Sequence, residues 1–264
     1  RVLILGANGF IGHHLSLRIL RDTDWEIYAM DREDDRILDL VDHPRFNFFV
    51  GDITVNLDWV DSQIEKCDVI LPLVAIATPS TYITDPLKVF ELDFEANLRI
   101  VRTVVRFQKR LIFPSTSEVY GMNDEGDFDP DNSKLVYGPI RKTRWIYACS
   151  KQLMDRVIVA YGLQHGLRYT LFRPFNWIGP GLDTLFSEHE GSCRVATQFL
   201  NNILRREPIV LVDGGSQRRC FTCVDDGIDA LMKILINPNG IADGKIYNIG
   251  NPNNDFSIAE LASR

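Results

Sequence analysis

Tyr147 and Lys151 lie four positions apart in a segment that begins at Trp145. In a helix their side chains would share one face, because residues four apart lie one turn above each other. A lysine ammonium beside a phenol favours the phenolate, and tyrosine, with a reference pKa of about 10, then becomes a usable general base near neutral pH. Hydride removal from an alcohol requires such a base. The alternative is a core tyrosine and a surface lysine without a joint role.

A glycine-rich segment, with Gly6, Gly9 and Gly12, follows an apolar run and opens a helical pattern. Such a loop turns tightly and brings backbone N–H groups and a helix N-terminus against a pyrophosphate. Asp31 ends the next apolar run. A carboxylate there accepts hydrogen bonds from the adenosine ribose of NAD and repels the 2′-phosphate of NADP. The adjacent Arg32 would tolerate that phosphate, so the sequence favours NAD without excluding NADP.

Two more polar segments follow apolar runs. Ser115–Gly121 comes directly after Arg110–Pro114 and contains Thr116, Ser117 and Glu118. Because ligands of open parallel sheets bind at the C-terminal ends of the strands, we expect this cluster at the site. Asp52 follows another apolar run and is expected near the adenine, unless it is an ordinary turn residue.

Alternating strands and helices must position these residues. Strands are predicted at Val2–Leu5, Glu26–Met30, Phe46–Val50, Val69–Leu73, Arg110–Pro114 and Tyr169–Pro174, and helices are predicted to begin near Phe10, Asn56, Pro86, Trp145 and Ser192. This alternation predicts an α/β fold, a Rossmann-type doubly wound parallel sheet, with residues 1–175 as the NAD-binding domain.

Residues 176–264 are predicted to form a smaller substrate-binding lobe over the sheet. Its expected elements are a helix at Ser192–Arg206, a strand at Ile209–Val212, a helix at Asp225–Leu235 and a strand at Ile246–Ile249. Ser257 and Glu260 are spaced as the capping box of a last helix. Because that helix has barely begun at Arg264, we expect further sequence beyond it.

Composition narrows the class of protein. The 264 residues, 45% hydrophobic and 25% charged, exclude a disordered or fibrous chain, and a net charge of −7 argues against nucleic-acid binding. No apolar run approaches the roughly 20 residues of a membrane span, and no signal peptide is visible, so we expect a cytoplasmic protein without membrane insertion. Five cysteines suit a reducing compartment, and the Cys220/Cys223 pair lacks partners for a zinc site, so no metal is predicted.

Together these motifs resemble the extended short-chain dehydrogenase/reductases that act on nucleotide sugars. The likeness spans the whole chain and includes Arg173–Pro180. Within that family, Thr116–Gly121 is characteristic of UDP-glucuronate decarboxylases. Leu71–Pro79, Arg144–Gln152 and Arg219–Thr222 resemble the decarboxylase domain of the bacterial polymyxin-resistance protein ArnA and its stand-alone relatives.

The resemblance implies that UDP-glucuronate is oxidised at C4 by NAD and then loses its carboxylate as CO2, which leaves UDP-4-keto-pentose. It implies that Tyr147 is the base, assisted by Lys151, that Thr116 bonds the same oxygen, and that Ser117 and Glu118 lie at C5, where Glu118 acts in decarboxylation. Implied NAD contacts are Gly6, Asn8, Gly9, Phe10, Ile11, Gly12, Asp31, Asp52, Ile53, Leu71, Ala75, Tyr147 and Lys151. Implied substrate contacts are Tyr82, in a loop approaching the sugar acid, Asn176, and Arg219 at the diphosphate.

The sequence departs from these relatives at Cys223, where Asp is expected, and at Asp225, where Arg is expected. Alternatives are a UDP-xylose synthase that returns the hydride to C4, another nucleotide-sugar epimerase or dehydratase, and a non-catalytic dinucleotide sensor. The intact Tyr147, Lys151 and Glu118 argue against the sensor. Glu118 could also be a loop carboxylate, and Arg219 a surface ion-pair partner. A homodimer or higher homo-oligomer is expected.

Overall fold

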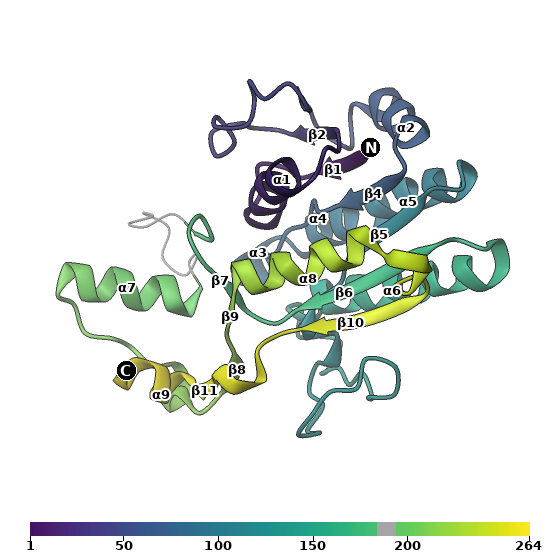
Figure 1. Cartoon of the computed structure of the whole chain (residues 1–264). Helices are drawn as coiled ribbons and strands as arrows, with labels where there is room; N and C mark the ends of the chain where they lie inside the picture. The colour runs from purple at the N-terminus through teal and green to yellow at the C-terminus, as the bar shows by residue number, and fades with distance from the viewer. Residues whose placement is uncertain (184–193) are drawn as a thin grey trace.

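Seven parallel strands form the central sheet of the computed structural model, which describes residues 1–183 and 194–264 (Figure 1). Their order is β10-β6-β5-β4-β1-β2-β3. The strands are β1 (Val2–Leu5), β2 (Ile27–Asp31), β3 (Phe46–Val50), β4 (Val69–Pro72), β5 (Arg110–Pro114), β6 (Tyr169–Pro174) and β10 (Lys245–Ile249). Because the order runs outward from β1 in both directions, the predicted Rossmann-type doubly wound fold is confirmed.

Helices cover both faces of this sheet. The helices are α1 (Phe10–Asp22), α2 (Leu57–Lys66), α5 (Asn97–Arg106), α6 (Trp145–His165) and α8 (Val224–Ile236). Val2 and Ile4 of β1 join the apolar cluster under α1 and α8, whereas Leu3 and Leu5 join the cluster under α2, α5 and α6. This alternation follows from the two-residue period of a strand, and burial on both faces explains why β1 is wholly apolar.

Shorter elements complete the chain. After β4 come α3 (Pro79–Thr84), α4 (Pro86–Phe90) and the π-helical segment η1 (Glu91–Ala96), and after β5 the 3-10 turn η2 (Ser117–Tyr120). The C-terminal part contains β7 (Trp177–Ile178), α7 (Val195–Arg205), η3 (Val212–Gly215), β8 (Arg218–Cys220), β9 (Thr222–Cys223), η4 (Pro238–Gly240), η5 (Pro252–Asn254), β11 (Asp255–Ser257) and α9 (Ile258–Ser263). The Ser257/Glu260 capping box of α9 is confirmed. None of the helices in the described ranges has the length and apolar character that crossing a bilayer requires.

The strand predicted at Ile246–Ile249 forms, but not in the C-terminal lobe. It belongs to β10, which pairs in parallel with β6 as an edge strand of the main sheet. The preceding helix α8 packs on α1, so this part of the chain completes the main layers. The division of the chain at residue 175 stays a prediction.

The strand predicted at Ile209–Val212 does not form. Residues 208–211 have no regular structure, and Val212 already belongs to the turn η3. Ile209 and Leu211 instead pack beside Phe199 and Phe221. An apolar β-branched run becomes a strand only where a partner strand is available, and the described residues bring none beside this run. Of the helix predicted at Ser192–Arg206, Ser192 lies outside the described residues, and α7 spans Val195–Arg205.

Candidate active site

The glycine loop lies between β1 and α1 and fits a dinucleotide diphosphate. Gly6 has a φ of +96°, and a Cβ on Gly12 would lie 2.2 Å from the carbonyl oxygen of Gly6, so both positions need glycine. Gly9 is the N-cap of α1 and supplies no capping side chain, and the first helical turn holds no acidic residue. The backbone N–H groups of Phe10 and Ile11 are therefore free of side-chain caps within the described ranges and suited to an anion.

Asp31, at the end of β2, lies directly beside this loop. Its carboxylate accepts hydrogen bonds from the backbone N–H groups of Asn8 at 2.9 Å and Arg32 at 2.8 Å. Burial raises the pKa of Asp31, while these two N–H groups oppose the rise. The Asn8 side chain is also engaged, because it donates to Asp35 and accepts from the backbone N–H of Arg36. Asp31 thus both shapes the loop and presents a carboxylate at the end of the second strand.

We expect the Asp31→Ala variant to bind NAD roughly 10–100-fold more weakly, the size of a lost hydrogen bond to a charged group, with a smaller loss for NADP. The lost acceptor would serve the free ribose hydroxyl that NADP lacks. Titration of both cofactors by calorimetry measures the difference. Asp31→Asn is the matched control, because its amide oxygen can still accept from Asn8. Equal losses for NAD and NADP would contradict the assignment.

The other expected cofactor residues lie at the same edge of the sheet but differ in the burial and hydrogen bonding of their side chains. Asp52 accepts hydrogen bonds from the backbone N–H and hydroxyl of Thr54 at 2.8 and 2.7 Å, and these bonds lower its pKa. The side chains of Ile53 and Leu71 are buried in the apolar core. Ala75 is half-buried in the segment after β4. These NAD contacts stay predictions.

Tyr147 lies near the start of α6, buried against Tyr82. The two rings stack with centroids 4.7 Å apart and planes within 7°. Tyr82 belongs to helix α3 rather than to the expected loop, and it is fully buried. Burial raises the pKa of Tyr147, the Asp93 and Glu118 carboxylates raise it further, and a hydrogen bond with the Thr116 side chain opposes the rise. The predicted lowering of this pKa by Lys151 is therefore not found.

Lys151 shares the buried face of α6 with Tyr147, and its amine is held from β5. Nζ donates a hydrogen bond to the backbone carbonyl of Pro114 at 3.0 Å, and only 1% of the residue is exposed. Burial lowers the pKa of Lys151, while Asp93 and Asp155 raise it. A buried ammonium needs acceptors and counter-charges, and the C-terminal end of β5 together with two carboxylates supplies them.

Asp93 is a site residue that the sequence motifs did not indicate. It lies in η1 and is fully buried, and one carboxylate oxygen accepts the backbone N–H of Ile76 at 2.8 Å. The other oxygen has no hydrogen-bond partner among the described residues. Burial raises the pKa of Asp93 to about 6, against an opposing effect of Lys151. No local signal marks it in the sequence, because Asp93 lies between two other acidic residues, Glu91 and Glu95.

We expect the Asp93→Asn variant to change the pH dependence of stability. A carboxyl whose folded pKa is raised to about 6 binds its proton more tightly in the folded state than in the unfolded state. Its contribution to stability is therefore lost as the pH rises from the unfolded pKa to the folded pKa. The unfolding free energy of the variant relative to wild type should therefore rise by about 2 kcal/mol between about pH 4 and about pH 7. Urea unfolding at several pH values measures this difference, and a pH-independent difference would contradict it.

Glu118 lies in η2, one turn beyond the end of β5. Its backbone N–H donates to the hydroxyl of Thr116 at 3.2 Å, and Oε2 lies 3.6 Å from the Arg144 guanidinium. Burial raises the pKa of Glu118, while Arg144 and then Arg219 lower it. Ser117, between Thr116 and Glu118, is half-buried. A carboxylate, a buried phenol and a threonine hydroxyl thus converge at one strand end.

The two expected substrate residues after β6 lie on neighbouring segments. Asn176 adopts a φ of +39°, and its side-chain amide donates to the carbonyl of Cys220 at 3.3 Å. Arg219, in β8, donates to the carbonyl of Arg218 and influences Glu118 electrostatically. Their contacts with a substrate stay predictions.

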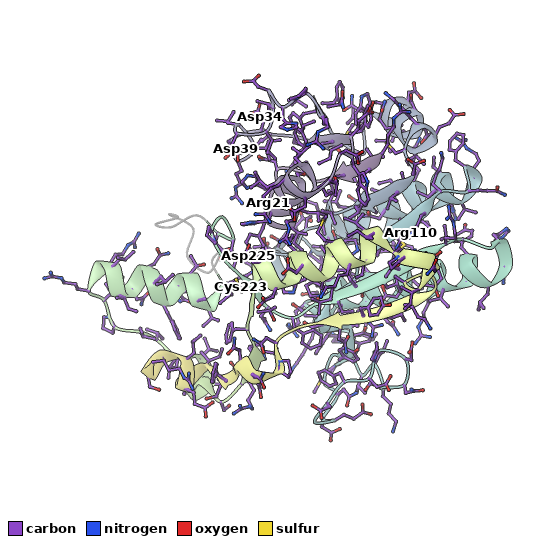
Figure 2. The ribbon with its side chains drawn as sticks, in the orientation of Figure 1. Arg21, Asp34, Asp39, Arg110, Cys223 and Asp225 are labelled. Carbon is purple, nitrogen blue, oxygen red and sulfur yellow. The ribbon has the colours of Figure 1, made fainter. Side chains whose placement is uncertain are left out.

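The described cysteines are free thiols that differ in exposure: Cys67 is buried, Cys149 and Cys220 are half-buried, and Cys223 is exposed. Cys220 donates to the carbonyl of Asn251 at 2.9 Å, and Cys223 is exposed at the N-cap of α8, near Asp225 (Figure 2). Cys193 lies outside the described residues. Within the described ranges no group of three or more His, Cys, Asp or Glu side chains could hold a metal ion.

Comparison with known proteins identifies the family to which the chain belongs. The family model for NAD-dependent epimerases and dehydratases matches residues 2–250. The crystal structure of the PbgP3 protein from Burkholderia pseudomallei shares 69% identity over 99% of this chain and 78% of its own, with a TM-score of 0.93.

Two structures at lower identity share the fold. They are the UDP-glucuronic acid 4-epimerase of Bacillus cereus (22% identity, 99% of this chain and 81% of its own, TM-score 0.82) and the dTDP-glucose 4,6-dehydratase DesIV of Streptomyces venezuelae (24%, 100% and 79%, 0.84). The expected cofactor, NAD, agrees with the family match. With a Rossmann-type sheet, a loop shaped for a dinucleotide and a matching family model over most of its length, this chain belongs to the NAD-dependent epimerase/dehydratase family.

Proposed function

We propose that the protein is an NAD-dependent UDP-glucuronate decarboxylase that produces UDP-4-keto-pentose. The observation that carries this proposal is the position of Glu118 beside Arg144, on the same turn as Thr116 and electrostatically coupled to Tyr147. Removal of a carboxylate next to a new ketone needs groups of this kind close to the oxidising residues. The resemblance of Thr116–Gly121 to decarboxylases supports the same assignment.

The first step is oxidation at C4 of the sugar. NAD, when bound, supplies the hydride acceptor and a positively charged nicotinamide ring. Tyr147 takes the proton of the C4 hydroxyl, and Thr116 hydrogen-bonds the same oxygen. Asp93 and Glu118 raise the pKa of Tyr147. A positive charge beside the phenol, such as that of the nicotinamide ring, would lower this pKa and offset their effect. Lys151 holds its own positive charge next to β5.

The second step is loss of CO2 from the resulting β-keto acid. The bond between C5 and the carboxylate breaks, and its electron pair moves into an enolate whose oxygen is stabilised by the Tyr147 and Thr116 hydroxyls. C5 then takes up a proton. Glu118 is suited to supply it, because burial raises its pKa and favours the protonated carboxyl.

The substrate groups that the proposal requires have chemically suitable partners. Arg219 is a planar donor for a diphosphate, and Arg144 is a second cation at Glu118 where the sugar carboxylate would arrive. The Bacillus cereus epimerase was solved with UDP-glucuronic acid and NAD. We also propose a cytoplasmic homodimer or higher homo-oligomer.

The decisive experiment is incubation of the protein with UDP-glucuronate and NAD, with the product identified by NMR, released CO2 trapped and NADH followed by absorbance. UDP-4-keto-pentose with stoichiometric NADH and CO2 is the expected result. UDP-xylose without net NADH would identify a synthase that returns the hydride. UDP-galacturonate without CO2 would identify an epimerase and overturn the proposal.

A further inference from the structure

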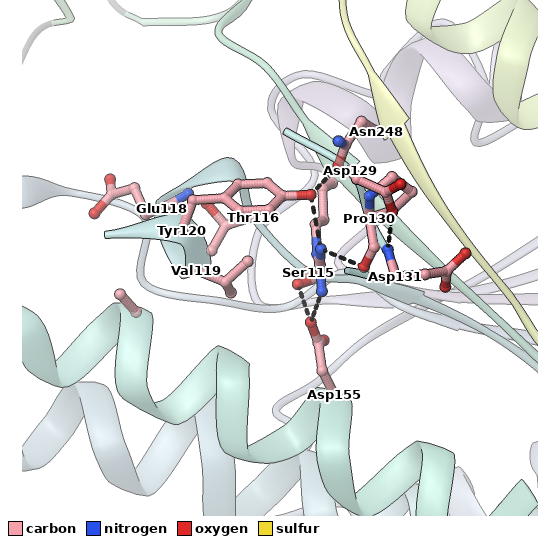
Figure 3. A network of polar contacts seen from close by, with 12 residues as sticks. Ser115, Thr116, Glu118, Val119, Tyr120, Asp129, Pro130, Asp131, Asp155 and Asn248 are labelled. Carbon is pink, nitrogen blue, oxygen red and sulfur yellow. Dashed lines mark hydrogen bonds and ion pairs between the residues drawn. The ribbon is translucent and has the colours of Figure 1, made fainter. Parts of the chain in front are cut away.

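Arg173 and Asp155 form a buried ion pair below the catalytic turn. Arg173 lies in β6 and Asp155 in α6, and they are 3% and 4% exposed. The guanidinium Nη2 lies 3.2 Å from Asp155 Oδ2. Figure 3 shows Asp155 within a polar network that also includes Ser115, Tyr120 and Asn248. Buried ion pairs contribute little net stability compared with apolar side chains of similar size. Stability alone therefore does not explain why Arg173 and Asp155 are paired in the core.

The network holds both ends of the turn that carries Thr116, Ser117 and Glu118. At its start, the Ser115 hydroxyl donates to the same oxygen of Asp155 at 2.7 Å. At its end, Arg173 Nη1 donates to the Tyr120 hydroxyl at 2.8 Å, and that hydroxyl donates to Asn248 at 2.8 Å (Figure 3). The catalytic turn is therefore anchored at residues 115 and 120 by groups from α6, β6 and β10.

The same network reaches the helix of the base and the acidic segment beyond the turn. Asp155 follows Lys151 by one helical turn on the buried face of α6, which also carries Tyr147. On the other side, Arg173 donates to the carbonyl of Pro130 at 3.2 Å. Asn248 donates to the carbonyl of Phe128, whose ring stacks on that of Tyr120 with centroids 4.3 Å apart.

We propose that Arg173 and Asp155 are positioning residues that set the distance between the Tyr147/Lys151 helix and the turn carrying Thr116 and Glu118. Oxidation and decarboxylation act on neighbouring carbons, so the base and Glu118 must be placed correctly relative to each other at the same time. Misplacement of a reacting group by about 1 Å lowers a rate on the order of 10²-fold. The positioning role depends on the proposed function in one respect: UDP-glucuronate is the substrate with which turnover is measured.

The first test compares two buried arginines on neighbouring strands. Arg173→Gln removes the positioning pair. Arg110→Gln is the matched control. Arg110 is 4% exposed and bonds Asp243 and the last carbonyls of α8 (Figure 2). It begins β5, whereas the turn follows the other end of that strand. Both variants should lose thermal stability. Only Arg173→Gln should lose kcat, roughly 10–100-fold, with KM and NAD affinity within about twofold of wild type. An equal loss of kcat in Arg110→Gln would overturn the proposal.

The second test uses a milder change and a readout independent of substrate. Tyr120→Phe keeps the ring stacked on Phe128 but removes the hydroxyl between Arg173 and Asn248. Hydrogen exchange of the cofactor-free protein, followed by mass spectrometry, should be faster at residues 115–121 in Tyr120→Phe and Arg173→Gln, and faster near α8 in Arg110→Gln. Unchanged exchange at residues 115–121 in both variants would overturn the proposal. If wild type does not turn over UDP-glucuronate, the proposed function fails, and the exchange result still decides the positioning role.

Discussion

Replacement of Tyr147 by phenylalanine is expected to lower the rate of sugar oxidation on the order of 10²–10⁴-fold while NAD affinity stays nearly unchanged. The variant keeps the aromatic ring that stacks on Tyr82 at 4.7 Å, so the packing at the start of α6 is preserved. It loses the phenol oxygen that accepts the proton from the C4 hydroxyl and that forms a hydrogen bond with Thr116. Single-turnover NADH formation measures oxidation directly, and calorimetry measures NAD binding.

Tyr82→Phe is the matched control for this prediction. It changes the other ring of the stacked pair by the same single oxygen, and Tyr82 is equally buried. NADH formation at saturating UDP-glucuronate should stay within a few-fold of wild type in Tyr82→Phe, because loss of the expected Tyr82 contact with the sugar acid raises KM and leaves the base in place. A Tyr147→Phe variant that keeps a tenth or more of wild-type turnover would remove Tyr147 from the role of base.

Glu118→Gln is expected to slow CO2 release from UDP-glucuronate on the order of 10²–10⁴-fold while NAD and UDP binding are preserved. The amide has the size of the carboxyl but cannot donate the proton that C5 takes up, so the enolate stays on the enzyme and CO2 release over repeated turnovers slows. Because the pKa of Glu118 is raised by burial, the wild-type carboxyl is a better proton donor near neutral pH than an exposed glutamate. Trapped CO2 and NADH absorbance, recorded together, separate decarboxylation from oxidation.

Two controls accompany this variant. Glu125→Gln changes an exposed glutamate on the acidic segment after the turn and should release CO2 at the wild-type rate. UDP-glucose has no carboxylate to lose, so any effect of Glu118→Gln on its oxidation reports on the hydride step alone. An undiminished rate of CO2 release in Glu118→Gln would make Glu118 an ordinary loop carboxylate and remove the main support for decarboxylation.

Features that depend on sequence neighbours could be predicted from the sequence. The turn at Gly6 and the close packing at Gly12 are requirements of a few consecutive residues, and the strand–loop–helix unit formed as predicted. The Ser257/Glu260 capping box is equally local. The apolar runs of β1, β5 and β6 were long enough to be recognised as strands, because parallel strands are buried on both faces. The family followed from motifs of this kind.

The tertiary structure alone decided the environment of these residues, because burial and charge depend on groups that are distant in sequence. Lys151 meets the carbonyl of Pro114, 37 positions away, and Tyr120 meets Asn248, 128 positions away. The run at Ile209 remained without a partner strand, whereas β10 found one in β6. The i, i+4 spacing placed Tyr147 and Lys151 on one helical face, but the direction of the Tyr147 pKa shift came from burial and from Asp93, which no local pattern links to it.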